Sequence, residues 1–281
     1  MTSSDPLVIV GIDGSPAGVG AVRWAADEAV RLQRPLQITH ALGASGRHEP
    51  TPEDLQPVVQ AAAEAQSFQP GLHVITSTWQ GEAAQILVEQ SRHASLVVVG
   101  SRGPSDVEPL PADSLGVRLA VHAHCPVLVV PDAQRWADPA AVLPKHPPVL
   151  VGTDSSDNAQ LAIELAFAEA ASRHVDLIAV RAWQEPPRRW GFAASPGRFA
   201  DLADRALAAD VEPWRAEHPR VRVELRCLHG APAPVLLAES RDALMVVLGP
   251  RGTGGSDELR LGSVTQQLLE HASAPVLVAR R

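Results

Sequence analysis

The sequence predicts an α/β protein of two tandem doubly wound domains, each a five-stranded parallel sheet with helices on both faces. Three observations lead to this prediction. The chain repeats itself, runs of Val, Leu and Ile alternate with helical patterns, and 281 residues are enough to build two separate cores. Strands made almost wholly of apolar residues are typical of a parallel sheet that is covered on both faces.

The internal repeat defines the domains. "QGEAAQILVEQSRHASLVVVGSRG" (80–103) aligns without a gap with "HGAPAPVLLAESRDALMVVLGPRG" (229–252), and "CPVLVV" (125–130) aligns with "APVLVA" (274–279) at the same offset. Near the start, "LVIVGIDGS" (7–15) matches "VLVGTDSS" (149–156). We therefore predict homologous domains at 1–130 and 148–281.

Residues 131–147 are rich in proline and alanine and are predicted to form a linker. Trp136 lies within this segment, and a tryptophan rarely sits in a fully solvated tether. Packing of part of the linker onto a domain therefore stays an open alternative.

The second copy illustrates the expected elements in order. Short apolar runs predict strands, the alternating run 221–228 predicts a half-buried strand, and longer stretches with apolar residues such as Leu161 and Leu165 predict helices. The expected order is strand 149–152, helix 158–173, strand 177–183, helix 199–216, strand 221–228, helix 234–240, strand 244–248, helix 263–271 and strand 275–279. Regular alternation of strands and helices is typical of doubly wound domains.

Composition and charge exclude several classes of function. A formal net charge of −8 argues against sequence-independent nucleic-acid binding, which needs a basic face. Lys145 is the only lysine, so a GxxxxGK[ST] phosphate loop is absent. No apolar run approaches about 18 residues, the length of a membrane-spanning helix, and the N-terminal residues lack a signal-peptide pattern. We expect a cytoplasmic protein without nucleic-acid or membrane partners.

The loop after the first strand is one candidate site, because doubly wound sheets bind ligands beyond the carboxyl ends of their strands. This loop carries Asp13 in "GIDGSPAG" and Asp154 in "GTDSSDN". On residue type alone, each carboxylate could instead cap the next helix or tighten the turn.

The second candidate is the glycine-rich loop "GPRGTGGSDELRLGS" (249–263), which follows the apolar run 243–248. Glycines let backbone N–H groups approach a phosphate without an intervening Cβ. The helix that follows offers unsatisfied N–H groups and the positive end of its dipole, and Ser263 adds a hydroxyl. This loop is a chemically reasonable anion site without a lysine, although a surface loop without a ligand would have a similar composition.

The glycine-rich loop matches the G-x2-G-x9-G-[ST] motif at every fixed position, and here the chain resembles the ATP-binding universal stress proteins. The Asp after strand one, "GSPAGVGAVRWAADEA" (14–29) and the closing strands agree with this family. The resemblance covers both copies. It implies the strand order 3-2-1-4-5 and pairing of two domains through their fifth strands, which a tandem chain can make internally. A homodimer of the whole chain is a further arrangement that we leave open.

The resemblance also implies a complete ATP site in the second copy. Gly152, Thr153 and Asp154 would lie near the ribose and adenine, Ala182 would offer its backbone to the adenine edge, and Leu248 would line the pocket. The phosphates, with or without Mg2+, would be held by the backbone of Gly249, Gly252, Gly262, Ser263 and Val264.

The first copy departs from the motif. Asp13, Ala41, Gly100, Gly103 and Ser114 match, but Asp113 replaces the third glycine, and the loop gains Asp106, Glu108 and three prolines. A carboxylate at a helix N-terminus accepts the N–H groups that a phosphate would use. The added charges would also repel a triphosphate unless a divalent cation bridged them. We predict weak or absent ATP binding in the first domain.

Other sequence patterns give weaker evidence for a functional site. "HAHC" (122–125) contains good metal ligands, but the repeat has "HASA" there, and we predict no metal site. Cys125 and Cys227 form no CxxC motif and are expected to be small buried residues. The tryptophans are expected to pack in the core, with Trp183 close enough to border adenine.

No Ser-His-Asp arrangement, paired carboxylates or general base can be identified from spacing. We therefore name no catalytic residue and expect slow ATP turnover at most. The expected function is that of an ATP-binding stress-response regulatory protein, whose nucleotide biases a conformational or assembly state. A slow ATPase or nucleotide-dependent enzyme, and a scaffold with a vestigial site, are the alternatives.

Overall fold

The structure is a computed structural model that describes residues 6–15, 18–43, 50–101, 114–131, 145–185, 196–253 and 261–281. The chain divides into two compact units, which are described one at a time. None of the helices in these ranges is both long and apolar enough to cross a membrane.

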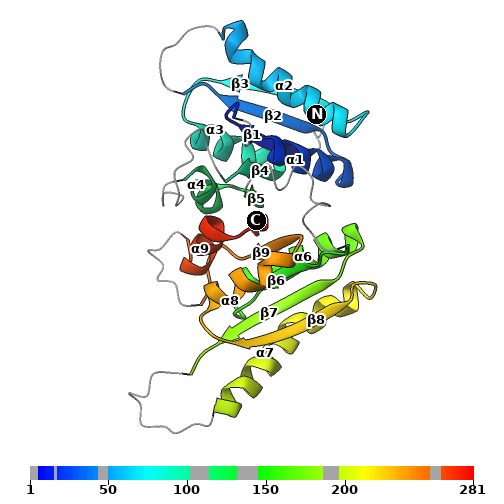
Figure 1. Ribbon diagram of the computed structural model, residues 1–281, viewed down its shortest axis with the longest axis vertical. Coiled ribbons are helices and arrows are strands. Elements are labelled where there is room, and N and C mark those ends of the chain that lie inside the picture. Colours follow the sequence, from blue (N-terminus) through cyan, green and yellow to red (C-terminus); the bar gives the residue numbers. More distant parts are fainter. Residues whose placement is uncertain are drawn as a thin grey trace. The chain divides into compact units, whose positions relative to one another are not determined.

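The first unit alternates strands and helices from its start (Figure 1). Its elements are β1 (Leu7–Ile12), α1 (Val19–Arg31), β2 (Leu36–Ala41), α2 (Pro52–Phe68), β3 (Val74–Trp79), α3 (Ala83–Gln90), β4 (Ala94–Gly100), α4 (Leu115–His122) and β5 (Val127–Val130). A single 3-10 turn, η2 (Ser91–His93), joins α3 to β4.

The second unit repeats this order. Its elements are β6 (Val149–Gly152), α6 (Asp157–Arg173), β7 (Leu177–Trp183), α7 (Pro196–Glu217), β8 (Val223–His229), α8 (Pro232–Glu239), β9 (Met245–Leu248), α9 (Ser263–His271) and β10 (Val276–Val278). The turn η5 (Ser240–Asp242) takes the place of η2.

Each unit forms a parallel sheet with the predicted strand order. The first runs β3-β2-β1-β4-β5 and the second runs β8-β7-β6-β9-β10. Both therefore have the order 3-2-1-4-5, and the predicted fold class is confirmed. In register, Val10 lies opposite Ile38 and Val98, while Val151 lies opposite Ala179 and Val247.

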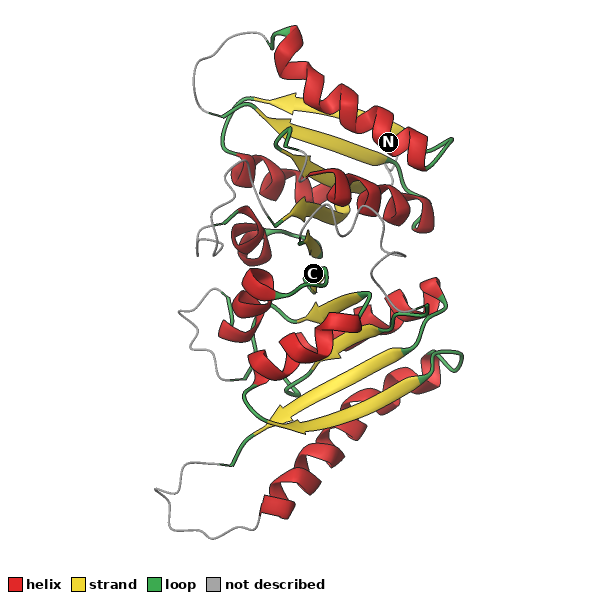
Figure 2. Cartoon of the chain, in the orientation of Figure 1, coloured by secondary structure: helices red, strands yellow, loops and turns green. Residues whose placement is uncertain are grey.

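Helices cover both faces of each sheet (Figure 2). Helices α1 and α2 contact each other on one face and α3 and α4 on the other, and α6 with α7 and α8 with α9 repeat this arrangement. The central strands are consequently buried on both faces, as the runs of Val and Leu predict. Strand order reverses between β6 and β9, so the loops that follow these two strands emerge side by side.

Where element boundaries differ from the predictions, they differ by one to three residues. The helix expected at 234–240 begins two residues earlier, since Pro232 is well suited to the first turn of a helix. The strand expected from Val221 begins at Val223, because the Val221 N–H closes a turn onto the His218 carbonyl. Cys125 is buried as expected, whereas Cys227 on β8 is partly exposed.

Candidate functional site

The loop after β6 is a tight turn that places Asp154 at the carboxyl edge of the second sheet. Ser155 takes the left-handed conformation with φ 65°. Ser156 is the N-cap of α6, and its hydroxyl accepts the Ala159 N–H at 3.2 Å. The Oδ1 atom of Asp154 accepts the Ser156 N–H at 3.1 Å. Asp154 therefore tightens the turn but does not cap the helix, which decides between the two structural alternatives for this residue.

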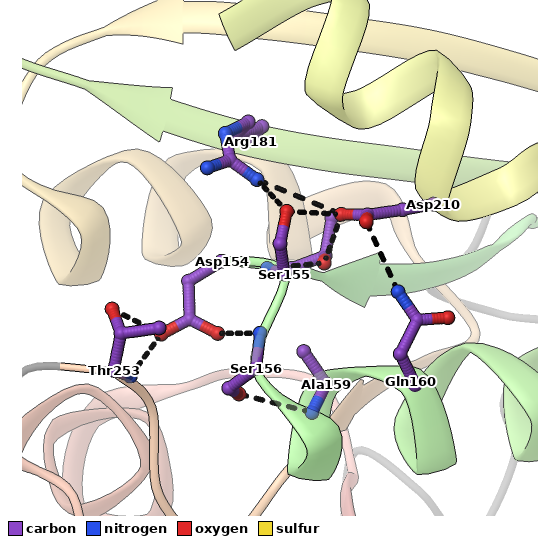
Figure 3. Close-up of polar contacts among 9 residues, drawn as sticks. Asp154, Ser155, Ser156, Ala159, Gln160, Arg181, Asp210 and Thr253 are labelled. Atoms are coloured by element: carbon purple, nitrogen blue, oxygen red, sulfur yellow. Dashed lines mark hydrogen bonds and ion pairs between the residues drawn. The ribbon is translucent and has the colours of Figure 1, made fainter.

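The second oxygen of Asp154 reaches the glycine-rich loop (Figure 3). Its Oδ2 atom accepts the Thr253 N–H at 2.6 Å and the Thr253 hydroxyl at 3.2 Å. A Cβ at Gly252 would collide with the same carboxylate. The structure thus brings Asp154 and Gly252, which lie far apart in the sequence, into direct contact.

These hydrogen bonds affect the ionisation of Asp154. Partial burial acts to raise the pKa of its carboxyl, but the hydrogen bonds from Ser156 and Thr253 together outweigh burial and hold the pKa below its usual value. Asp154 is therefore an anion at neutral pH, and it fastens the two loops at the switch point of the sheet.

Helix α9 begins at the end of the glycine-rich loop without a side chain to cap it. Its N-cap is Gly262, and no side chain among the described residues makes a cap hydrogen bond there. The Gly262 N–H donates to the Pro250 carbonyl at 2.8 Å, and a Cβ on Gly262 would lie 3.2 Å from the Arg251 Cα. In the first turn Ser263 is exposed and Val264 partly exposed, and no described side chain takes their N–H groups, so these can serve an external acceptor.

Two further glycines are required by close packing. A Cβ on Gly249 would lie 2.7 Å from the Asn158 carbonyl oxygen at the start of α6. A Cβ on Gly152 would lie 2.8 Å from Leu248 and 2.9 Å from Leu236, and Leu248 is itself buried. These two glycines let α6 and the apolar core come close to the switch point, which is a packing reason that the motif alone does not indicate.

Ala182, another predicted residue of the second copy, lies near the end of β7 opposite Leu228 of β8. Trp183 follows it, and its ring meets the His229 ring edge-on with centroids 4.7 Å apart. Ala182 therefore lies on the same sheet edge as Asp154. Its strand β7 is two strands away from β9, which the glycine-rich loop follows.

The first copy has a different helix start. Ser114 is the N-cap of α4, and its hydroxyl accepts the Val117 N–H at 3.4 Å. We expected Asp113 to occupy this capping place, and that expectation is wrong by one residue because Ser114 itself caps the helix. Asp113, Gly103, Asp106 and Glu108 lie outside the described residues.

The other first-copy residues lie where the repeat places them. Asp13 is exposed and accepts the Ser15 N–H at 2.9 Å, as Asp154 accepts Ser156. Ala41 ends β2 opposite Trp79, and Gly100 ends β4 opposite Val130. The first copy therefore retains the edge of the sheet but starts its last helix with an internal cap.

A comparison with known protein families identifies the family of both copies. The model of the universal stress protein family matches residues 7–131 and again 146–280. The chain belongs to the universal stress protein family. It is a tandem member, because the family model matches twice.

Curated relatives of this universal stress protein are also similar over nearly their full length. It is 34% identical to universal stress protein Rv2623 of Mycobacterium tuberculosis over 292 aligned positions, which cover 97% of this chain and 96% of the relative. A universal stress protein of Mycolicibacterium smegmatis is 31% identical, with 97% and 96% covered. Among solved structures, a universal stress protein from Archaeoglobus fulgidus has the same fold, with a TM-score of 0.71, 17% identity and 99% and 97% of the two chains covered.

Sequence reasoning missed one group of residues in this universal stress protein. Asp210 on α7 accepts the hydroxyls of Thr153 and Ser155, the two neighbours of Asp154. Arg181 on β7 donates to Ser155, and Gln160 on α6 donates to Asp210 (Figure 3). A signal was present in the repeat, since Ser155 stands where the first copy has Gly14. No pattern within helix α7, however, identifies Asp210 as the partner of that loop.

Proposed function

We propose that this universal stress protein is a regulatory protein that binds ATP in its second domain and turns it over slowly or not at all. The observation that carries the proposal is the start of α9. There no described side chain caps the helix N-terminus, and the described glycines of the preceding loop lack the Cβ atoms that would narrow it. Such a terminus attracts anions through its free N–H groups and its dipole.

The residues of the family motif then have separate roles in the proposal. The backbone of Gly249, Gly252, Gly262, Ser263 and Val264 holds the phosphates, helped by the Ser263 hydroxyl. Asp154, with Gly152 and Thr153, lies at the ribose and adenine end, Ala182 offers backbone groups to the adenine edge, and Leu248 closes the apolar side. Mg2+ enters with the triphosphate, since it prefers phosphate oxygens and water to an all-protein cage.

The first domain is proposed to bind ATP weakly or not at all. Ser114 occupies the N-terminus of α4 with its own hydroxyl, and the sequence adds Asp113 directly before it. An anion that binds there must displace a hydrogen bond within the protein and approach a carboxylate. At α9 no cap from a described side chain has to be displaced, and Gly262 stands where the first copy has Asp113. The two domains therefore differ in affinity in this proposal.

The test is isothermal titration calorimetry of nucleotide-free protein with ATP. We expect one site per chain, which Gly262→Asp abolishes because the new carboxylate takes the free N–H groups of α9. Gly197→Asp is the matched control, since Gly197 is exposed and no described residue lies within 4 Å of the place that its Cβ would take. Two equal sites would overturn the difference between the domains, and no binding would overturn the proposed function.

A further inference from the structure

Asp210 is a nearly buried carboxylate that collects hydrogen bonds from the loop before α6. It is 9% exposed. One oxygen accepts the Ser155 hydroxyl at 2.7 Å and the Thr153 hydroxyl at 3.0 Å, and the other accepts the Gln160 side-chain amide at 3.0 Å. Asp210 thereby links helix α7 to the turn and to the second turn of α6.

Arg181 completes this cluster from β7. Its guanidinium donates to the Ser155 hydroxyl at 2.6 Å and lies 3.6 Å from the same Asp210 oxygen. The Ser155 hydroxyl therefore accepts from Arg181 and donates to Asp210 at once. Hydrogen bonds to a charged partner are the stronger kind, and two of them meet at this one hydroxyl.

The backbone of Ser155 indicates why this cluster matters. Its φ of 65° is in the left-handed region, which costs a residue with a Cβ about 1–2 kcal/mol. The first copy has Gly14 at this position, with φ 80°, and glycine adopts that conformation without the cost. In the second copy a serine is held in the glycine conformation, and its hydroxyl is fixed by Arg181 and Asp210.

The first copy has no equivalent polar anchor in its described residues. A Cβ on Gly14 would lie 3.2 Å from the Pro57 side chain of α2. His40 stands at the position that aligns with Arg181 in the repeat. His40 contacts the Ile12 carbonyl through Nδ1 at 3.0 Å instead of reaching the turn. The apolar contact and the polar anchor are thus alternative ways to support the same turn.

We propose that Asp210 is a positioning residue for the nucleotide site: by holding Thr153 and Ser155, it keeps Asp154 between them aimed at the glycine-rich loop. This inference rests on the proposed function, because the site that it serves is the proposed ATP site. Asp210 itself touches no nucleotide in this proposal and acts only through the turn.

The first experiment measures ATP affinity by calorimetry on the full chain. If loss of the anchor leaves about a tenth of the molecules with the turn in place, the apparent Kd rises about tenfold. We expect this rise for Asp210→Asn and also for Ser155→Ala, which keeps the Cβ but loses the hydroxyl of an exposed residue and so leaves the core intact. Glu212→Gln removes the same charge from an exposed position of α7 and is expected to bind like wild type.

The decisive variant is Ser155→Gly in the Asp210→Asn background. Glycine adopts the left-handed conformation without an anchor, so it is expected to restore at least half of the lost affinity on a logarithmic scale. A merely structural role of Asp210 predicts the opposite, since the two losses would then add. Hydrogen exchange of the Ser155 and Ser156 amides gives an independent readout, and it is expected to accelerate in Asp210→Asn and in Ser155→Ala.

Each outcome decides something. Wild-type affinity in Asp210→Asn or in Ser155→Ala, or a double variant that binds ATP no more tightly than Asp210→Asn, would overturn the positioning role and leave the proposed function standing. Absence of ATP binding by the wild type would overturn the proposed function, and the positioning role with it. If Asp210→Asn does not fold, Ser155→Ala tests the same anchor from its exposed side.

Discussion

The two halves of this universal stress protein share one fold but support the same sheet edge by different means. At the last helix, the first half has Ser114 as an internal cap, whereas the second half begins α9 on Gly262, which no described side chain caps. At the turn after the first strand, the first half packs Gly14 on Pro57, whereas the second half holds Ser155 through Asp210. At the helix start, the first half caps N–H groups with its own serine, and no described side chain of the second half does so. At the turn, the first half has a glycine without a polar side chain, whereas the second half has a serine whose hydroxyl is hydrogen-bonded.

The outer strands also differ between the two halves. In the first half, Thr39, Ser77 and Gln90 form a neutral hydrogen-bonded group on β2, β3 and α3. In the second half, Arg226 on β8 bonds to Glu224 and to Glu239 on α8. The aligned outer strands are therefore supported by a neutral group in one half and by an ionic group in the other.

The largest expected effect comes from exchanging the loops. Replacing "GSRGPSDVEPLPADS" (100–114) by the equally long "GPRGTGGSDELRLGS" keeps the serine at 114 but puts glycine in place of Asp113, so that the first copy matches the motif at every fixed position. We expect the ATP stoichiometry measured by calorimetry to rise from one site per chain to two. A stoichiometry of one in a folded graft would mean that the difference between the halves lies outside this loop.

Gly252→Ala is the next most disruptive change. Its Cβ meets the Asp154 carboxylate, so the contact between the two loops must open. We expect ATP affinity to fall at least about tenfold and the free energy of unfolding to fall by about 1–3 kcal/mol. Calorimetry and urea denaturation measure these two quantities, and Gly197→Ala, in open space, is the control. Unchanged affinity would show that ATP binding does not depend on the contact between Asp154 and the glycine-rich loop.

Removing the hydroxyls at the two helix starts should affect the halves in opposite ways. Ser114→Ala deletes the cap of α4 and is expected to lower the free energy of unfolding by about 1 kcal/mol, as measured in urea. Ser263→Ala, at the aligned position, removes an exposed hydroxyl that makes no cap hydrogen bond within the described part of the chain. It should leave stability nearly unchanged and weaken ATP binding. Equal losses of stability would contradict the assignment of the caps.

A smaller effect is expected from acid titration. The pKa of Asp154 is lowered in the folded state, so this carboxylate stabilises the fold above the unfolded-state pKa of about 3.9. Its contribution is lost as the pH falls through the lower, folded-state pKa. The free energy of unfolding of wild type should therefore decrease more steeply than that of Asp154→Asn as the pH is lowered from about 5 towards 2. Parallel curves would show that the contact with Thr253 does not favour the ionised carboxylate.

The smallest effect is expected at the outer strand. Arg226→Ser gives β8 the residue that β3 has at the aligned position, Ser77. Partly exposed ion pairs contribute about 0–1 kcal/mol, so urea denaturation should detect only a small loss, which shrinks further at high salt. A loss above about 2 kcal/mol would show that the ionic group on β8 has a larger role than its exposure suggests.

Much of this molecule could be predicted from its sequence. The repeat and the runs of Val and Leu predicted the fold class, and strands such as β7 and helices such as α9 have the predicted bounds. These features are local or repeated, so a linear pattern records them. The cap of α4 was misplaced by one residue, since Asp113 and Ser114 are both good capping residues and only the backbone selects between them. The proposed ATP site and the pairing of the fifth strands stay predictions.

The sequence by itself determined the order of the elements and the place of the motif loops 100–114 and 249–263, because hydrophobic periodicity, motif and repeat are properties of the chain. The tertiary structure decided which groups meet there. Asp154 lies 99 residues from Thr253, and Asp210 lies 55 residues from Ser155. No local pattern records such pairs, since parallel strands join at the sheet only after long crossovers, and the contacts depend on how helices α6 and α7 pack on the sheet.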